Sequence, residues 1–212
     1  YGDGALGSRG AWLLEDYSDE AGNRGQPNMI IDSVYSVARR ALKSGFQVNT
    51  HAIGDRANRE ILDQYEKAFK ENPDAAENTR FRIEHAQHLH PDDIPRFKKL
   101  GVIAAMQAVH LSSDRPWAIN RLGAKRIIDG AYVWKSLLNT GAIIVNGSDV
   151  PVEPINPLAS FYASVTRKTL KGEPEGGYEP EQAMTREQAL RSYTLDAAYG
   201  AFEENIKGSI RP

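Results

Sequence analysis

Four side chains that could hold a metal ion or move a proton stand at the ends of short apolar segments. They are His51, His85, His110 and Asp149. Successive members lie about one strand–helix unit apart, and consecutive strands of a parallel barrel deliver their carboxyl ends to one face. Imidazole and carboxylate are the ligands of zinc, manganese or iron sites that keep a position open for water. The spacing therefore indicates a metal centre or an acid–base site at that face.

Each of these residues also has a purely structural interpretation. A single histidine at a strand end is more often a hydrogen-bonded structural residue than a ligand. Asp149, which follows Gly147 and Ser148, could simply cap a turn. A functional site is nevertheless indicated, because the same topological position is filled four times in succession.

The elements that would position these residues alternate in type. At three places an apolar-periodic helix leads to a glycine (Gly45, Gly101, Gly141) and then to a short apolar strand. A glycine just past a helix end adopts the left-handed conformation that closes the helix. Including a fourth strand after a helix over 57–69, the expected strands cover residues 46–51, 82–85, 102–106 and 142–145. Helices that alternate with strands predict an α/β fold with a parallel sheet.

The C-terminal part is predicted to be mainly helical. Asn156 and Pro157 indicate the start of a helix over 158–168. Residues 169–184 are rich in Gly, Pro and Glu and predict a mobile surface loop. A last helix, running to about residue 201, should begin at Thr185 with Gln188 completing a capping box. No linker divides the chain, so one domain is expected.

Composition narrows the classes of function. The chain has 212 residues, of which 41% are hydrophobic and 25% charged, with a formal net charge of −2, which is ordinary for one globular domain. A net charge this close to zero gives no sign of the excess of basic residues that binds nucleic acid or an anionic membrane. No apolar run approaches the roughly 20 residues that span a bilayer. There are no cysteines, which excludes disulfides, thiol catalysis and cysteine-ligated metal sites. We therefore expect neither nucleic acid nor a membrane as a partner.

Three other patterns could indicate a ligand or metal site, but their sequence context favours a structural role or no site. The glycines between Gly2 and Gly7 match the dinucleotide fingerprint, but no strand precedes them. His88 and His90 have the alternating spacing of a metal pair, yet the Pro-Asp-Asp that follows favours helix capping or solvent exposure for both. Asp55 is four residues after His51, but it is expected to stabilise the N-terminus of the next helix.

Several motifs, in this order, resemble one family. They cover residues 3–9 (Asp-Gly-Ala-Leu-Gly-Ser-Arg), 51–55 (His-Ala-Ile-Gly-Asp), 82–87 (Arg-Ile-Glu-His-Ala-Gln), 147–152 (Gly-Ser-Asp-Val-Pro-Val), 185–190 and 208–210. Together they are similar to the amidohydrolase superfamily, in the branch of amidohydrolase family 3 that contains N-substituted formamide deformylases. The resemblance implies a TIM-type (β/α)8 barrel and one or two divalent metal ions, with zinc as the expected metal.

The resemblance also implies roles for individual residues. His51 and His85 match metal ligands after strands five and six of the barrel. Asp149, after strand eight, matches the carboxylate that binds metal and takes a proton from the attacking water. His110 and Arg9 fall where the family has substrate-facing residues.

Some parts of the family pattern are missing. The His-x-His pair after strand one and the bridging lysine or glutamate of strand four have no counterpart in residues 1–212. The chain thus resembles the stretch from the end of strand four through strand eight, and we expect a C-terminal piece of a hydrolase barrel, truncated at both ends. Half a barrel leaves two sheet edges unpaired, which predicts self-association or a homo-oligomer. An incomplete ligand set predicts weak or absent metal binding.

The function that follows is hydrolysis of a carbon–nitrogen bond other than a peptide bond, in a small amide or formamide-like substrate. Two alternatives stay open at this point. One is a related barrel hydrolase that acts on esters or phosphoesters. The other is a catalytically inert half-barrel, since this chain by itself is expected to be inactive.

Overall fold

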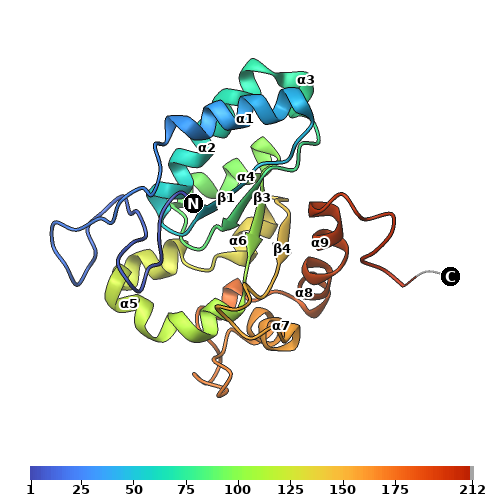
Figure 1. Cartoon of the computed structure of the whole chain (residues 1–212). Coiled ribbons are helices and arrows are strands. Elements are labelled where there is room, and N and C mark those ends of the chain that lie inside the picture. Colours follow the sequence, from blue (N-terminus) through green and yellow to red (C-terminus); the bar gives the residue numbers. More distant parts are fainter. Residues whose placement is uncertain (211–212) are drawn as a thin grey trace.

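Four short parallel strands form the centre of the molecule in a computed structural model that describes residues 1–210 (Figure 1). They are β1 (Asn49–Ala52), β2 (Arg82–His85), β3 (Ile103–Met106) and β4 (Ile144–Asn146), in the spatial order β1-β2-β3-β4. Neighbouring strands all pair in parallel. All four expected strands are present, and the α/β fold with a parallel sheet is confirmed. The first strand begins at Asn49, three residues later than predicted.

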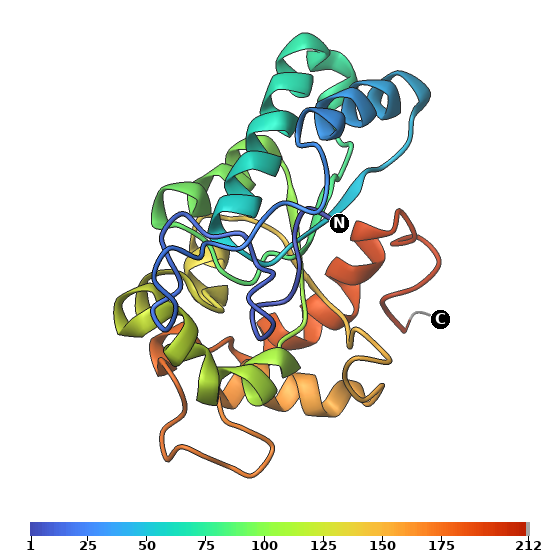
Figure 2. The ribbon, with the colours of Figure 1, turned by 60° about the vertical axis from the view of Figure 1, so that its left-hand side comes forward.

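Helices connect and flank the strands (Figures 1 and 2). The α-helices are α1 (Asp32–Ser44), α2 (Asp55–Glu71), α3 (Pro73–Ala76), α4 (Ile94–Leu100), α5 (Val109–Gly130), α6 (Trp134–Asn139), α7 (Pro157–Thr166), α8 (Arg186–Tyr193) and α9 (Leu195–Gly200). Two short 3-10 helices are η1 (Pro91–Asp93) and η2 (Pro180–Gln182). Within residues 1–210, no helix has both the length and the apolar content that crossing a bilayer requires.

The predicted glycine stops are confirmed. Gly45, Gly101 and Gly141 have φ angles of 71°, 66° and 83°, in the left-handed region that ends a helix. On α1, the residues Val34, Ala38 and Leu42 recur at helical spacing and are buried. The same local rule therefore sets where the polypeptide enters three of the four strands.

The two faces of the sheet are covered differently. Ile83, Ala104 and Ile144 are in register on one face and lie in the main core, with apolar residues of α2, α4 and α6. On the other face, Ala105 and Val145 are in register and pack with Ala197 and Tyr199 of α9. His51 of β1 and Glu84 of β2 are in register with Ala105 on this second face. The second face therefore has polar residues on β1 and β2 and a small apolar cluster on β3 and β4.

Two predictions for the C-terminal part need correction. The last helix is divided into α8 and α9 by Thr194, whose φ of −124° and ψ of −89° are not helical, although the capping box of Thr185 and Gln188 is present. The segment 169–184 is not simply a surface loop, because Glu179 accepts hydrogen bonds from the buried guanidinium of Arg115. Met184, at its end, is buried in the core. The ion pair of Glu179 and the burial of Met184 fix the second half of this segment against the rest of the protein. Composition alone does not predict such contacts.

The first 31 residues form a long loop on the carboxyl side of β1. A buried carboxylate, Asp3, accepts hydrogen bonds from the backbone N–H groups of Trp12, Ile53 and Gly54. The carbonyl of Trp12 in turn accepts the N–H groups of Arg56 and Ala57, in the first turn of α2. The loop is thus fixed to the end of β1, and it caps α2, the helix that follows β1.

Candidate metal centre

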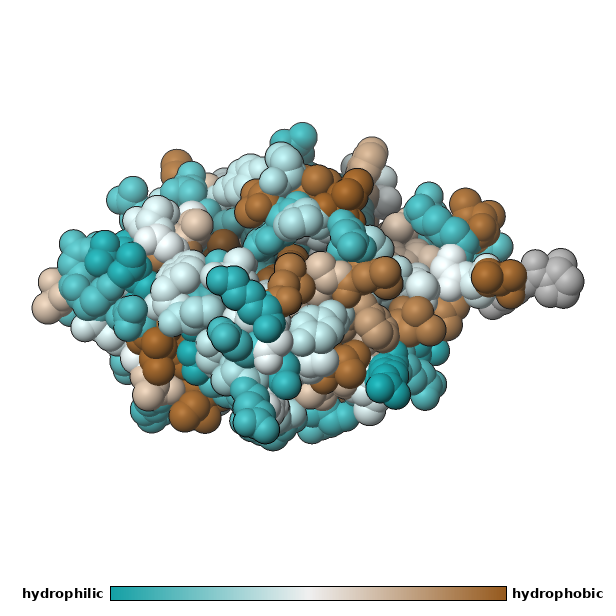
Figure 3. All heavy atoms as spheres, turned by 90° about the horizontal axis from the view of Figure 1, so that it is seen from below, coloured by the Kyte–Doolittle hydropathy of each residue, from teal (hydrophilic) through white to brown (hydrophobic). Residues whose placement is uncertain are grey.

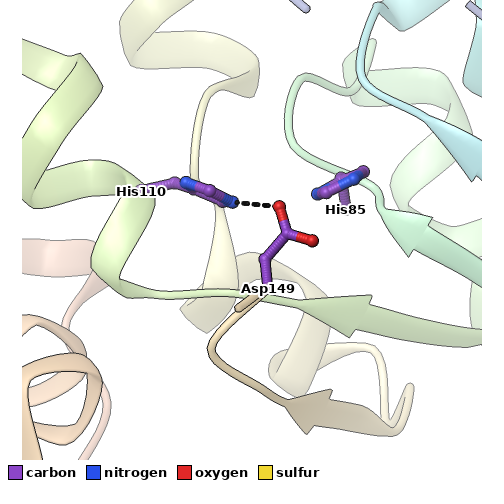
Figure 4. Close-up of side chains that lie close together, drawn as sticks. All are labelled: His85, His110 and Asp149. Carbon is purple, nitrogen blue, oxygen red and sulfur yellow. Dashed lines mark hydrogen bonds and ion pairs between the residues drawn. The ribbon is translucent and has the colours of Figure 1, made fainter. Parts of the chain in front are cut away.

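Three of the predicted site residues converge at the carboxyl ends of the strands (Figure 4). His85 is the last residue of β2, His110 is in the first turn of α5 after β3, and Asp149 follows β4. One potential ligand atom from each of the three lies within 4.8 Å of the others. Nε2 of His110 is 3.2 Å from Oδ2 of Asp149. Segments separated by about 25 to 40 residues in the chain therefore meet at one point, as parallel topology requires.

Two of these three residues have unusual backbone conformations. The φ angles are 74° at His85 and 58° at Asp149, in the left-handed region that side chains with a Cβ rarely adopt. Each such residue costs of the order of 1–2 kcal/mol, and such strain tends to cluster at functional sites. From these positions both side chains point toward His110 (Figure 4).

Gln107 determines which nitrogen of His85 is free. Nε2 of Gln107 donates to the carbonyl of Ala105 at 3.2 Å, so its Oε1 is an acceptor. That Oε1 lies 2.6 Å from Nδ1 of His85, which must then carry the proton. The lone pair of His85 is consequently on Nε2, available to a metal ion. A histidine ligand is commonly oriented in this way by a hydrogen bond to its other nitrogen.

His110 lies between two carboxylates. Besides its contact with Asp149, its Nδ1 is 3.3 Å from Oε1 of Glu153, which also accepts a hydrogen bond from Ser113. The imidazole is buried, whereas the side chain of Asp149 is 32% exposed. The cluster therefore has a buried side, formed by α5, and an open side where a small molecule could approach.

Burial and neighbouring charges set the protonation states at the site. Burial, reinforced by His51, lowers the pKa of His85 to about 4, although Asp149 opposes the shift. Burial raises the pKa of Glu84, on the second face of the sheet, and Arg82 opposes that shift. A His85 that is neutral at pH 7 is in the form a metal ion needs.

His51 and Arg9 are placed less centrally. The ring of His51 is 4.6 Å from that of His85, edge to face, but His51 is outside the three-residue group. Arg9 forms ion pairs with Asp19 and Glu20 in the N-terminal loop. The structure thus brings His51 next to the cluster, while the substrate-binding role of Arg9 stays a prediction.

The prediction that His88 and His90 cap a helix or lie exposed is correct for His90 and wrong for His88. His90 behaves as predicted, because its Nδ1 accepts the N–H of Asp92 at 3.3 Å at the start of η1. The expectation of capping or exposure is wrong for His88, which is 3% exposed and packs against Tyr132. Burial lowers the pKa of His88 to about 3. Asp55 is the first residue of α2, as expected, and its Oδ1 also accepts the N–H of Leu14.

Sequence reasoning did not single out Gln107 and Glu153, although both contact the site histidines. Gln107 directly follows β3, so the rule that selected the other strand ends would have found it. Glu153 lies in an irregular turn beyond Asp149, where residue spacing gives no signal.

The donor set suits a divalent metal such as zinc. It offers imidazole nitrogen and carboxylate oxygen, one histidine is neutral with Nε2 free, and one side is open for water or substrate. The residues present therefore fit the ion that the sequence motifs imply. His85, His110 and Asp149 are close enough to share it, and His51 is adjacent.

These features define an α/β protein that carries a candidate metal site at the carboxyl ends of parallel strands, as barrel enzymes do. The chain belongs to the amidohydrolase family, whose model matches residues 1–212. The family expected from the sequence motifs, amidohydrolase family 3, is thereby confirmed.

Individual relatives support the family and show its extent. The chain is 40% identical over 210 residues to Protein LONG AFTER FAR-RED 3 of Arabidopsis thaliana and 32% identical over 210 residues to Putative amidohydrolase YtcJ of Bacillus subtilis (strain 168). These matches cover 99% of this chain but 35% and 39% of those proteins. The N-substituted formamide deformylase of Arthrobacter pascens is more distant, at 29% identity over 178 residues, which is 84% of this chain and 32% of that protein.

A solved structure confirms the architecture. The crystal structure of an uncharacterized metal-dependent hydrolase from Pyrococcus horikoshii OT3 matches with a TM-score of 0.85 at 32% identity, over 100% of this chain and 41% of that chain. The four parallel strands and their helices thus correspond to part of an amidohydrolase barrel.

Proposed function

We propose that this chain supplies part of the active site of a zinc-dependent hydrolase that cleaves carbon–nitrogen bonds other than peptide bonds in small amide or formamide-like molecules. The observation that carries the proposal is the convergence of His85, His110 and Asp149 within 4.8 Å, in a chain of the amidohydrolase family. The name of the Arthrobacter relative supports the choice of a formamide-like substrate.

Each residue has a distinct part in this proposal. His51, His85 and Asp149 hold the metal, and the free Nε2 of His85 suits that role. A divalent metal, when bound, lowers the pKa of water from 15.7 to about 7. Asp149 takes the proton of the attacking water and returns it to the leaving amine, because its side chain is ionisable and partly exposed. Nε2 of His110 exchanges its contact with Asp149 for a hydrogen bond to the substrate oxygen, while Nδ1 stays beside Glu153. Arg9 contacts a remoter part of the substrate.

A substrate panel tests the reaction. This chain within a complete barrel of the length of its curated relatives, loaded with zinc, would be incubated with N-alkyl formamides, N-alkyl acetamides, carboxylic esters and phosphoesters. Release of amine, alcohol and phosphate would be measured. Release of amine from the formamides or amides supports the proposal. Turnover of esters or phosphoesters alone would replace it with the related hydrolase activity.

We also propose that the chain by itself binds metal weakly and is inert. The chain spans 35% and 39% of the Arabidopsis and Bacillus relatives, and the cluster is open on one side. Dialysis against a mild chelator should remove zinc from the isolated chain, and the isolated chain in excess zinc should turn over no substrate of the panel. Stoichiometric zinc retained after this dialysis would contradict the proposal.

A further inference from the structure

A cleft of about 1070 Å³ opens at a place that the proposed function does not use. Its walls are the N-terminal loop over residues 14–21, the turn over 88–92 that follows β2, and residues 122–130 of α5, with two residues of α2. We call it the loop–α5 cleft. No residue of the metal cluster is in its lining. Cavities of roughly 300–1,000 Å³ usually hold small-molecule ligands, so this cleft has room for one.

His88 is an unsatisfied polar side chain in the lining of this cleft. The residue is 3% exposed, and both Nδ1 and Nε2 are buried without a hydrogen-bond partner within residues 1–210. Burial, reinforced by the charge of Arg126 in the same lining, lowers the pKa of His88 to about 3. The ring is therefore neutral at pH 7 and has one lone pair that can accept a hydrogen bond. Folded proteins rarely leave such atoms unpaired, which points to a partner from outside the chain.

The charged residues of the lining are mostly acidic. Five carboxylates face three cations, namely Glu15, Asp16, Asp55, Asp92 and Asp129 against Arg59, Lys125 and Arg126. Arg59 is in an ion pair with Asp93, and Lys125 is in one with Asp129. Arg126 donates to three backbone carbonyls. Because the cations are already engaged, an anionic ligand would meet an excess of negative charge, whereas a cationic ligand would be attracted.

Asp55 has one carboxylate oxygen that the protein does not use. Oδ1 accepts the N–H groups of Leu14 and Arg56, at 2.9 Å each, whereas Oδ2 has no hydrogen bond or ion pair within the described part of the chain. Burial raises the pKa of Asp55, and the two N–H groups oppose that shift. A partly desolvated carboxylate with a free oxygen gains from a positively charged hydrogen-bond donor.

Asp55 and His88 lie close to each other. Nδ2 of Asn58 donates to the carbonyl of Gly54, next to Asp55, and also to the carbonyl of His88. The charge of Arg126 acts on both side chains. The free oxygen and the buried lone pair thus belong to one part of the cleft.

We propose that the loop–α5 cleft binds a small organic ammonium ion with an apolar body. The ammonium group donates to Oδ2 of Asp55 and to the lone pair of His88, and the body packs on Leu14, Pro91 and Leu122. The inference goes beyond the proposed function, since this site shares no residue with the metal cluster and needs neither zinc nor a substrate.

Ordered water alone makes a different prediction. Water can satisfy a buried histidine and a free carboxylate oxygen in a polar cleft. In that case an organic ligand would gain nothing from a positive charge, and a neutral molecule of the same shape would bind equally well or not at all. The dependence of binding on the charge of the ligand therefore separates the two interpretations.

The first experiment compares three probes of similar shape in the unaltered chain without metal. The probes are 2-phenylethylamine, which is an ammonium ion at pH 7, the uncharged 2-phenylethanol and the anionic 3-phenylpropionate, each titrated to millimolar concentration and followed by ¹H–¹⁵N NMR. We expect saturable shifts with the ammonium at residues 14–18, 88–90 and 122–126, and binding of the other two that is at least about 10-fold weaker. Equal binding of the three probes, no binding of the ammonium, or shifts confined to the metal cluster would overturn the inference.

The second experiment compares two aspartates of the same lining. Asp55→Asn keeps an oxygen for the N–H groups of Leu14 and Arg56 but loses the charge, so the ammonium should bind at least about 10-fold more weakly. Asp16→Asn is the matched control, because the carboxylate of Asp16 is already paired with Arg24, and its affinity should stay within about twofold of the wild type. Equal affinity in a folded Asp55→Asn, or an equal loss in Asp16→Asn, would overturn the inference.

A third variant keeps the test decisive if Asp55→Asn does not fold. His88→Phe removes the lone pair and should weaken the ammonium at least about fivefold while leaving 2-phenylethanol nearly unchanged. The same affinity for the ammonium in His88→Phe and in the wild type would overturn the inference. Because no probe is a substrate and zinc is absent, failure of this site leaves the proposed function untouched, and failure of the hydrolase activity leaves this site untouched.

Discussion

At the scale of single residues, Asp149 combines three properties that a catalytic carboxylate needs. It contacts His110, it remains partly exposed, and its left-handed backbone turns it toward the cluster. An aspartate that only capped a turn would not need to contact a buried histidine, as Asp149 contacts His110. The turn interpretation and the functional one are compatible, since the strained turn is what positions the carboxylate.

Asp149→Asn should abolish catalysis without unfolding the protein. In the complete zinc-loaded barrel used for the substrate panel, we expect kcat to fall by about 10²–10⁴, because an amide cannot take a proton from water. Asparagine tolerates a φ of 58° at least as well as aspartate, so the fold should persist. The variant His90→Asn, outside the cluster, is the control. Near-normal turnover in Asp149→Asn would remove this residue from the mechanism.

His88 makes the stability of the protein depend on pH. Burial lowers its pKa to about 3, against about 6.5 in the unfolded chain, so the unfolded state takes up a proton first as the pH falls. Its contribution to stability is complete above pH 6.5 and is lost on acidification. Between pH 7 and 5 the loss should be about 2 kcal/mol.

The variant His88→Phe isolates this contribution. It keeps an aromatic ring against Tyr132 but cannot titrate, so its free energy of unfolding in urea should fall about 2 kcal/mol less than that of the wild type between pH 7 and 5. His85, whose pKa is also lowered, acts equally in both proteins. The same pH slope in wild type and His88→Phe would contradict the assignment.

At the scale of elements, close backbone approaches fix the N-terminal loop to α2. A Cβ on Gly54 would lie 2.0 Å from the carbonyl oxygen of Trp12, the group that caps α2. By contrast, a Cβ on Gly45 would meet nothing within 4 Å, although Gly45 has a φ of 71°. The two glycines therefore separate the cost of a clash from the cost of a left-handed backbone.

Gly54→Ala should destabilise the protein more than Gly45→Ala. For Gly45→Ala we expect about 1 kcal/mol, the usual cost of a Cβ at positive φ. For Gly54→Ala we expect about 2–3 kcal/mol, since the Trp12 carbonyl must move and α2 loses its cap. Urea unfolding of both variants measures the difference. Equal losses would mean that the loop can shift away from α2 at little cost.

The elements that sequence could predict are those set by local rules. Glycines predicted the ends of three helices, and the capping box predicted the start of α8. Both signals depend only on residues that are neighbours in the sequence. The break at Thr194 and the burial of His88 were missed, since both depend on tertiary contacts. At the site, strand-end positions identified His85, His110 and Asp149, whereas Glu153 approaches His110 through an irregular turn that no periodicity reveals.

At the scale of the whole molecule, the sheet has two outer strands, and each pairs on one side only. β1 pairs with β2 and β4 with β3, while the carbonyl of His51 additionally accepts the N–H of Gly2. Large apolar side chains stay exposed, among them Phe46 at 70%, just before β1, and Ile155 at 73%. Figure 3 shows brown apolar side chains gathered in the middle and on the right of the lower face. Unpaired strands and exposed apolar groups both favour association.

We therefore propose that the chain self-associates through its sheet edges, and Phe46→Lys tests this. A lysine beside β1 keeps the strand but adds a charge at the edge, the means by which natural sheets avoid edge pairing. Sedimentation velocity should give dimers or larger species for the wild type at micromolar concentration and a shift toward monomer for Phe46→Lys. Ile128→Lys, which alters an exposed residue of α5 and not of a sheet edge, should leave the distribution unchanged. A wild-type monomer that binds no hydrophobic dye would contradict the proposal, because edges and apolar groups would then be satisfied within one molecule.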